Sequence, residues 1–183
     1  MKISEIIEFE KIDPETSDIH WVAGALTKRK DERRPHVKFI HVKDGEFTAT
    51  DGSRIHTYES EVSCKDGFYS VIKRCKSNVI LRFEGATEEY PEFKSLLNTE
   101  GHDETIYAYA DLGNCSGSYA GIVHAMKAGT LNYDFLKDLF SEDDGFDVFI
   151  KDAESPIIFK NGKKTAVLMP MRTDNYDQNN KEV

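Results

Sequence analysis

The sequence predicts an α+β protein made of a duplicated unit, in which one helix is followed by antiparallel strands. A helical pattern followed by strand patterns begins near residue 16 and again near residue 132. Elsewhere apolar and polar residues mostly alternate, and the tight-turn pairs Asp44-Gly45 and Asn161-Gly162 join neighbouring strand patterns. A repeated helix-then-strands order is the simplest account of these patterns.

The first predicted helix covers residues 16 to 30. Asp13 provides an N-cap, Pro14 suits the first turn, and Glu15 places negative charge near the positive end of the helix dipole. Apolar residues then recur at helical spacing, at Ile19, Val22, Ala23 and Leu26. The segment ends in a basic run, where positive charge favours the C-terminal end of a helix.

The rest of the first half is predicted to be mostly sheet. From Pro35 the period changes to two, and residues 36–42 and 46–50 form a hairpin around Asp44-Gly45. Further strands are expected at 54–61, 68–72 and 79–83.

The second half returns to the same elements. Asn132 is expected to cap a second helix. The apolar face of this helix is formed by Phe135, Leu136, Leu139 and Phe140. Strands are expected at 105–110, 121–126, 146–151, 156–160 and 165–169. We therefore divide the chain into a first half, 1–97, a second half, 98–172, and a polar tail, 173–183, which is expected to be disordered.

The composition indicates an acidic globular protein. The chain has 183 residues, of which 39% are hydrophobic, and 24 basic against 33 acidic residues give a net charge of -9. No apolar stretch is long enough to span a bilayer and the N-terminus is too acidic for a signal peptide, so we expect a cytoplasmic protein. Cys64, Cys75 and Cys115 show no C-x-x-C spacing, so the sequence predicts neither a disulfide framework, a metal site nor a cofactor.

Three short segments that lie far apart in the chain resemble one family. Residues 49–55, ATDGSRI, are similar to the A-T-D-G-H-R-L segment of the bacterial DNA sliding clamp, the β subunit of the replicative DNA polymerase. Residues 89–94, EYPEFK, resemble the clamp's F-P-D-Y-R segment, and residues 167–172, VLMPMR, resemble its C-terminal V-V-M-P-M-R-L. Residues 151–153, KDA, are similar to the E-D-A before its final hairpin. The shared order of these segments strengthens the resemblance.

The resemblance implies a clamp-like fold with a groove for a short hydrophobic peptide of a DNA polymerase or another replication protein. Flexible methionines suit the walls of such a groove, and polar groups fix the peptide backbone. We expect close backbone approach and hydrogen bonds from Thr50 and Gly52, and positive charge at the rim from Arg54 and Arg172. The residues expected at this peptide site are Thr50, Gly52, Ser53, Arg54, Ile55, Pro91, Lys94, Leu96, Val167, Met169, Pro170, Met171 and Arg172.

A second set of residues is basic and is expected to contact the phosphates of duplex DNA without reading its sequence. The resemblance supports this expectation, because clamps combine net acidity with a basic inner surface. An ordinary solvated charge run is the alternative. We expect the peptide and DNA sites to use different residues. The expected DNA contacts are Lys28, Arg29, Lys30, Arg33, Arg34, Lys73 and Arg74.

The sequence also departs from the clamp family. That family's chain carries three domains and is about twice as long, so this chain is either a pair of trimmed clamp domains or one domain with an insertion near 62–117. Family rings contain six similar domains, which would require three or six copies of this chain. Ser53 replaces the usual histidine, and Ser95 stands where a second arginine would follow Lys94.

The leading prediction is a homo-oligomeric, clamp-like processivity factor. The alternative is an adaptor or decoy that keeps the groove and does not encircle DNA. Asp51 and His56 could be imagined as a catalytic pair, but no nucleophile motif accompanies them, and no enzyme is predicted. Asp51 is instead expected to shape a turn with Gly52.

Overall fold

The computed structural model describes residues 6–10, 13, 15–29, 32–75, 77–86, 90–102, 104–108, 122, 130–141 and 145–171. Its helices are α1 (Thr16–Ala23) and α3 (Tyr133–Leu139), with short 3-10 turns η1 (Pro35–Val37) and η2 (Lys94–Leu97). Its strands are β1 (Ile6–Glu10), β2 (Ile40–Lys43), β3 (Glu46–Thr50), β4 (Arg54–Glu59), β5 (Gly67–Cys75), β6 (Asn78–Gly85), β7 (Glu104–Ala108), β8 (Phe146–Ile150), β9 (Ile157–Asn161) and β10 (Lys164–Leu168).

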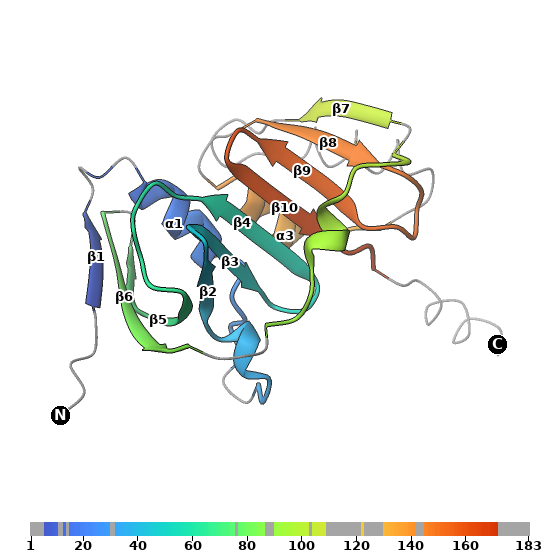
Figure 1. Ribbon diagram of the computed structural model, residues 1–183. Helices are drawn as coiled ribbons and strands as arrows, with labels where there is room; N and C mark the ends of the chain where they lie inside the picture. The colour runs from blue at the N-terminus through green and yellow to red at the C-terminus, as the bar shows by residue number, and fades with distance from the viewer. Residues whose placement is uncertain are drawn as a thin grey trace.

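The strands of the described residues form one antiparallel sheet. Its order is β1-β6-β5-β2-β3-β4-β10-β9-β8-β7 (Figure 1). Each helix precedes a three-stranded meander, α1 before β2-β3-β4 and α3 before β8-β9-β10, and the two meanders meet through their last strands. This arrangement confirms the predicted α+β class and its duplicated helix-plus-sheet unit.

The junction between the two meanders is a register of five residue pairs. It runs from Arg54 opposite Leu168 to Tyr58 opposite Lys164. Segments more than a hundred residues apart in the chain therefore lie side by side at the centre of the sheet.

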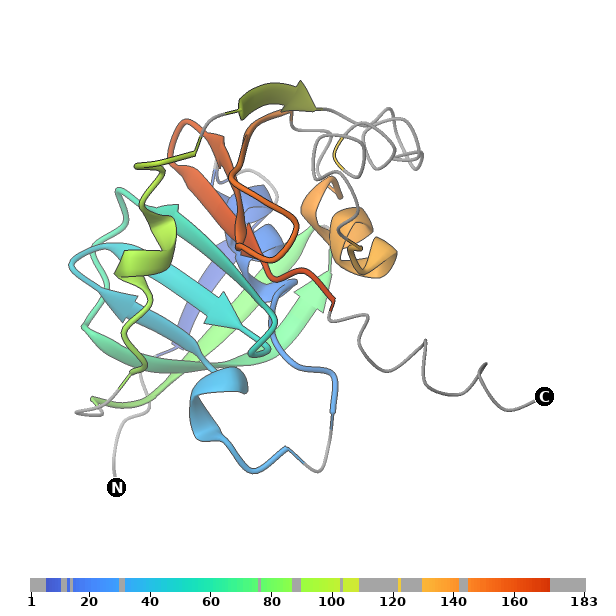
Figure 2. The ribbon, with the colours of Figure 1, turned by 90° about the vertical axis from the view of Figure 1, so that its right-hand side faces the viewer.

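Both helices cover the same side of the sheet, as Figure 2 shows. One core contains Ile19 and Trp21 of α1 together with Leu136 and Leu139 of α3. The indole Nε1 of Trp21 donates to the carbonyl oxygen of Leu139 at 2.8 Å, which joins the two helices directly. A smaller apolar cluster lies beneath the segment that contains η2.

Both predicted hairpins form, but the turn of the second is of another type. Asp44 (φ 51°) and Gly45 (φ 82°) both adopt the left-handed conformation that a type I′ turn requires, which confirms the first hairpin. In the second, Asn161 pairs with Lys164, so the central residues are Gly162 and Lys163. Of these only Gly162 has a positive φ, 54°, as in a type II′ turn rather than the type I′ turn expected from Asn161-Gly162.

The first helix is shorter than predicted. It ends at Ala23, and the amides of Gly24 and Ala25 bond to carbonyls three residues back, at 3.0 Å each. A Cβ at Gly24 would lie 2.8 Å from the carbonyl oxygen of Trp21, so this tight final turn requires a glycine. The amide of Thr27 then bonds to Val37, which directs the chain towards η1.

Two strand predictions also require correction. Pairing in β2 begins at Ile40, because Pro35 starts a 3-10 turn and proline has no amide hydrogen to donate to a sheet. The strand predicted over 121–126 is wrong at Ile122, the described residue of that range, which is helical and fully buried in the core. Apolar residues in a buried helix and in a buried strand look alike in a short sequence window.

Several predictions fall outside the described residues. These are the disordered tail 173–183, the thiol of Cys115, and the roles expected of Lys30 and Arg172.

Burial of His56 predicts a loss of stability in acid. Its ring is fully buried, stacks on Trp21 with centroids 4.2 Å apart, and its Nδ1 lies 3.0 Å from the carbonyl oxygen of Trp21. Burial lowers the pKa of His56 to about 3, below the 6.5 of an unperturbed histidine. Between these values the unfolded chain binds a proton that the folded chain does not, so this histidine destabilises the fold by about 1.4 kcal/mol per pH unit as the pH falls below 6.5.

The test compares urea unfolding of the natural protein and His56→Phe at pH 7, 6, 5 and 4. We expect the free energy of unfolding to fall less steeply with acidification in the variant. Equal slopes for the two proteins would contradict the assignment.

Candidate functional site

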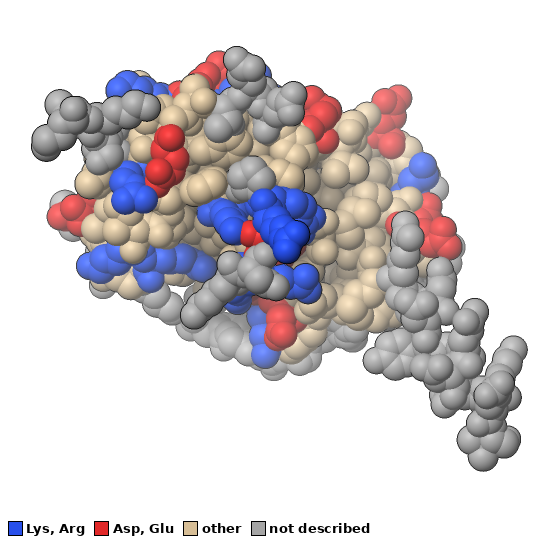
Figure 3. All heavy atoms as spheres, turned by 90° about the horizontal axis from the view of Figure 1, so that it is seen from below, with Lys and Arg blue, Asp and Glu red and all other residues tan. Residues whose placement is uncertain are grey.

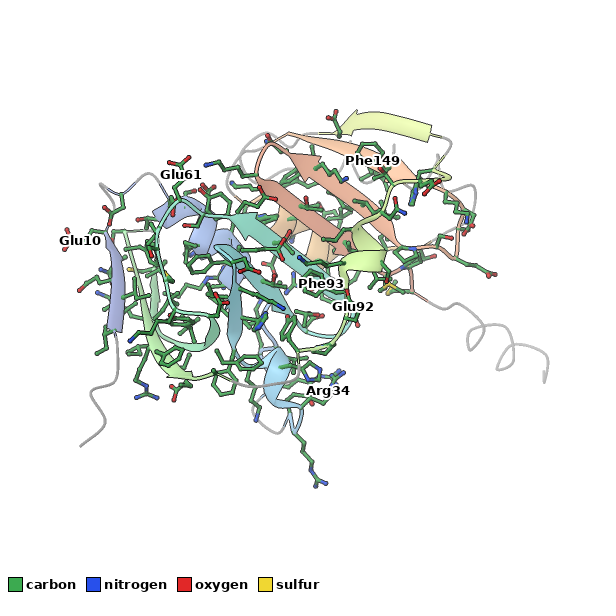
Figure 4. All side chains as sticks on the ribbon, viewed as in Figure 1. Glu10, Arg34, Glu61, Glu92, Phe93 and Phe149 are labelled. Atoms are coloured by element: carbon green, nitrogen blue, oxygen red, sulfur yellow. The ribbon has the colours of Figure 1, made fainter. Side chains whose placement is uncertain are left out.

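The three segments that carry the family resemblance meet at the β4–β10 junction. The amide of Met169, just after β10, donates to the carbonyl oxygen of Ser53 at 2.9 Å. Beside this bond, Ile55 of β4 and Val167 of β10 pack with Phe93 and Ile158 in the smaller apolar cluster. Partly buried apolar residues complete the cluster, namely Tyr90, Leu96, Leu97 and Phe149 (Figure 4).

Two exposed methionines follow β10. Met169 is 39% exposed and Met171 is 46% exposed, and they are two of the four large apolar side chains that are exposed in the described part of the chain. Pro170 between them is partly buried, whereas Val167 and Ile55 are buried. We call the site the junction surface, defined by Ser53, Ile55, Leu96, Val167, Met169 and Met171.

The β3–β4 turn is held by its own side chains. The hydroxyl of Thr50 donates to the carbonyl oxygen of Arg54 at 2.6 Å and accepts from the amide of Gly52 at 3.0 Å. The Asp51 carboxylate accepts from the amides of Ser53 and Arg54, which confirms that Asp51 shapes the turn. The Thr50 hydroxyl is thus already engaged within the turn, while Gly52 and Ser53 are exposed.

The prediction for Arg54 at the rim is wrong. Only 3% of its side chain is exposed, and its guanidinium binds Asp51 at 3.0 Å, Asp138 of α3 at 2.8 Å and the carbonyl oxygen of Gly24 at 2.9 Å. It also lies over the Phe135 ring, 4.4 Å from the centroid. Arg54 therefore fastens the turn to both helical segments from inside the protein. The sequence could not identify Asp138 as its partner, because the two residues are 84 positions apart.

Pro91 and Lys94 belong to a neighbouring cavity. Both are exposed and line a space of about 270 Å³ together with His41 and Tyr90. The His41 and Tyr90 rings stack with centroids 4.4 Å apart, and burial lowers the pKa of His41. Of the residues between Tyr90 and Leu97 predicted for the peptide site, only Leu96 packs into the cluster of the junction surface.

Most of the predicted DNA contacts lie on an exposed stretch between α1 and η1. We call Lys28, Arg29, Arg33 and Arg34 the basic segment; Figure 3 shows Lys and Arg side chains gathered near the middle of this face. The Arg34 guanidinium donates to both carboxylate oxygens of Glu32, at 3.0 and 2.9 Å, and these bonds lower the pKa of Glu32 to about 2. The ammonium of Lys28 lies 3.6 Å from Asp138.

Lys73 and Arg74 are exposed on β5. A Cβ placed on Gly24 would lie 3.2 Å from the guanidinium of Arg74, so Arg74 reaches the residue that follows α1.

The basic segment also adjoins the predicted peptide site, although the two sets consist of different residues. A cavity of about 400 Å³ is lined by Lys28, Arg29 and Arg34 on one side and by Gly52 and Ser53 on the other. A Cβ at Gly52, whose φ is 93°, would lie 2.8 Å from the Arg34 guanidinium.

The acidic side chains of the two helices are mostly paired in the described residues. Asp18 of α1 binds Lys164 at 2.6 Å, and Asp138 of α3 binds Arg54 at 2.8 Å. Asp134 and Lys137 of α3 are exposed. Asp51 and His56 do not form a catalytic pair. The Asp51 carboxylate is bound to Arg54, while the buried His56 faces Trp21.

No group of three or more metal-binding side chains occurs in the part of the chain that the structure describes.

Comparison with solved structures gives one consistent result. A DNA polymerase III beta chain from Streptococcus pneumoniae superposes with a TM-score of 0.58 at 12% identity, covering 94% of this chain and 66% of that chain. The corresponding protein of Borrelia burgdorferi, solved in complex with a natural product, gives 0.55 at 13% identity, with 92% and 64% covered. A third, from Pseudomonas aeruginosa, gives 0.53 at 10% identity, with 91% and 66% covered.

This chain has the fold of the bacterial sliding clamp. The clamp fold holds over more than nine tenths of the chain, which spans just under two thirds of the clamps compared above. No protein-family model matches the sequence, and no curated protein matches it. None of the helices in the described residues is both long and apolar enough to cross a membrane.

Arg54 offers a direct test of how the turn is held. Arg54→Met leaves the carboxylates of Asp51 and Asp138 without their buried partner, and we expect a loss of about 2–4 kcal/mol in the free energy of unfolding. Lys28→Ala is the matched control, because Lys28 is 77% exposed and its ion pair should contribute about 0–1 kcal/mol. Urea denaturation measures both. Equal losses in the two variants would contradict the inferred role of Arg54.

Proposed function

We propose that this protein is a clamp-like tethering factor, which binds a short hydrophobic peptide of a DNA polymerase or another replication protein at the junction surface and holds it on duplex DNA. The supporting observation is the meeting of the three clamp-like segments around the bond between Ser53 and Met169. The proposed role is binding rather than catalysis, in the cytoplasm and without a cofactor.

The junction surface has the chemistry that such a peptide needs. Met169 and Met171 are flexible and exposed, so they can repack around leucine and phenylalanine side chains of different partners. The amides of Gly52 and Ser53 and the Ser53 carbonyl are bonded within the protein, so the exposed hydroxyl of Ser53 would supply the hydrogen bond to an extended peptide. Arg54 contributes by fixing the turn that carries these residues, not by direct charge.

In the proposed assembly, residues 1–97 and 98–172 act as two clamp-like halves. A ring of six such halves requires three chains, so a homo-oligomer is part of the proposal. Arg33 of the basic segment, with Lys73 and Arg74, would contact DNA phosphates.

One observation favours a second candidate, an adaptor or decoy that binds the peptide and never encircles DNA. The chain carries a net charge of -9, and an evenly acidic surface would repel a phosphate backbone. The mass in solution separates the candidates, because a ring must be an oligomer and a decoy can be a monomer.

The peptide site is tested with the exposed methionines. Met169→Ala with Met171→Ala should weaken binding of a labelled Gln-x-x-Leu-Phe peptide by about 1–3 kcal/mol, because both residues would anchor its apolar side chains. Ile72→Ala is the control, since Ile72 is 49% exposed and lies on β5. Fluorescence titration reports the affinities. The peptide proposal fails if the natural protein shows no saturable binding up to millimolar peptide.

DNA holding is tested on nicked circular and linearised duplex. Arg33→Glu with Lys73→Glu should reduce retention on circles and make the remaining retention less dependent on salt, because two phosphate contacts are lost and fewer counterions are released on binding. Both residues are exposed, and neither lines the cavity beside Gly52. The natural protein should remain on circles and slide off linear ends. A monomeric mass with and without circular DNA would exclude the ring and leave the adaptor.

A further inference from the structure

The cavity of about 400 Å³ between the basic segment and the β3–β4 turn extends the junction surface. Ser53 belongs to both, since it lines the cavity and its carbonyl oxygen accepts from Met169. A peptide seated against Met169 would therefore carry its flanking residues towards this cavity.

The basic side chains around the cavity differ in how closely carboxylates bind them. Arg34 forms an ion pair with Glu32, and Arg54 forms ion pairs with Asp51 and Asp138. Lys28 makes one long contact, 3.6 Å, with Asp138, and 77% of its side chain is exposed. Arg29 is exposed and its guanidinium has no partner among the described residues, so it is the cavity's open cationic group.

The carboxylate of Asp134 also lines the cavity. Asp134 stands in the first turn of α3, where the unpaired amides of the helix end offset part of its charge. The backbone of Arg29 is held in place, because its amide donates to the Thr27 hydroxyl at 3.2 Å. The cavity thus presents an exposed cation, Arg29, together with Ser53 of the junction surface.

We propose that this cavity receives an acidic side chain next to the hydrophobic motif of the bound peptide, and that Arg29 with Lys28 selects partners with acidic flanks. The inference rests on the proposed peptide-binding function and deepens it. A peptide carboxylate would bind Arg29 and Lys28. A continuous phosphate backbone, with a charge at every nucleotide, would also meet the exposed carboxylate of Asp134 on the same cavity wall, which disfavours DNA as the occupant.

The test uses two labelled peptides with the same Gln-x-x-Leu-Phe motif, one flanked at both ends by aspartates and the other by lysines. The natural protein should bind the acidic peptide on the order of tenfold more tightly at low salt, with the ratio shrinking as salt screens the charges. Arg29→Gln should reduce this ratio severalfold. Its folding should be unaffected, because the Arg29 side chain is exposed and has no partner among the described residues.

Lys28→Glu with Arg29→Glu should reverse the preference. Lys38→Glu with Lys43→Glu is the matched control, since it makes the same charge change at two exposed lysines that do not line the cavity. Equal affinity of the natural protein for both peptides would overturn the inference, as would equal effects of the test and control variants. Loss of DNA retention in Lys28→Glu/Arg29→Glu, with peptide preference unchanged, would assign the segment to DNA instead. Failure of both peptides to bind would count against the proposed function itself.

Discussion

The pairing of β4 with β10 determines where every part of the candidate site lies. Its five residue pairs bring Ile55 opposite Val167 and place the turn before β4 against the chain that leaves β10. The bond from the Met169 amide to the Ser53 carbonyl continues this ladder beyond the last pair. On the side of the sheet that the helices cover, Arg54 extends the same register to α3 and to the end of α1. Without this register, the three family-like segments would share no surface.

Local rules predicted the parts of the fold that local chemistry controls. The left-handed conformations at Asp44 and Gly45, and the bond that the Asp134 amide donates to the Asn132 side chain, depend on groups within a few residues of one another. The early end of α1 was missed because it depends on the close approach of Gly24 to the Trp21 carbonyl oxygen and on the bond from the Thr27 amide to Val37. The alternation of apolar residues placed most strands to within a few residues, but it missed β1, predicted a strand where Ile122 is helical, and could not reveal which strands are neighbours.

Prediction of the candidate site also succeeded for local features and failed for contacts between distant parts of the chain. Motif order correctly indicated segments that come together, because those segments carry the residues of one junction. It misjudged Arg54, since an arginine in a turn usually reaches solvent and only the tertiary structure supplies Asp138. It also separated the basic segment from Gly52, although Arg34 lies directly over that glycine. Charge patterns in sequence do not encode such contacts across the fold.

The continuous sheet has a consequence for how this molecule can be divided. Cutting between the two halves would strip β4 and β10 of their partners and leave a row of unsatisfied amides and carbonyls on each piece. Arg54 would lose Asp138, and Trp21 would lose the Leu139 carbonyl. The halves are alike in architecture yet are not interchangeable modules. A domain inserted into such a chain must bring a complementary strand edge with it. The architecture therefore favours the gain or loss of a whole repeat over the exchange of one half for another domain.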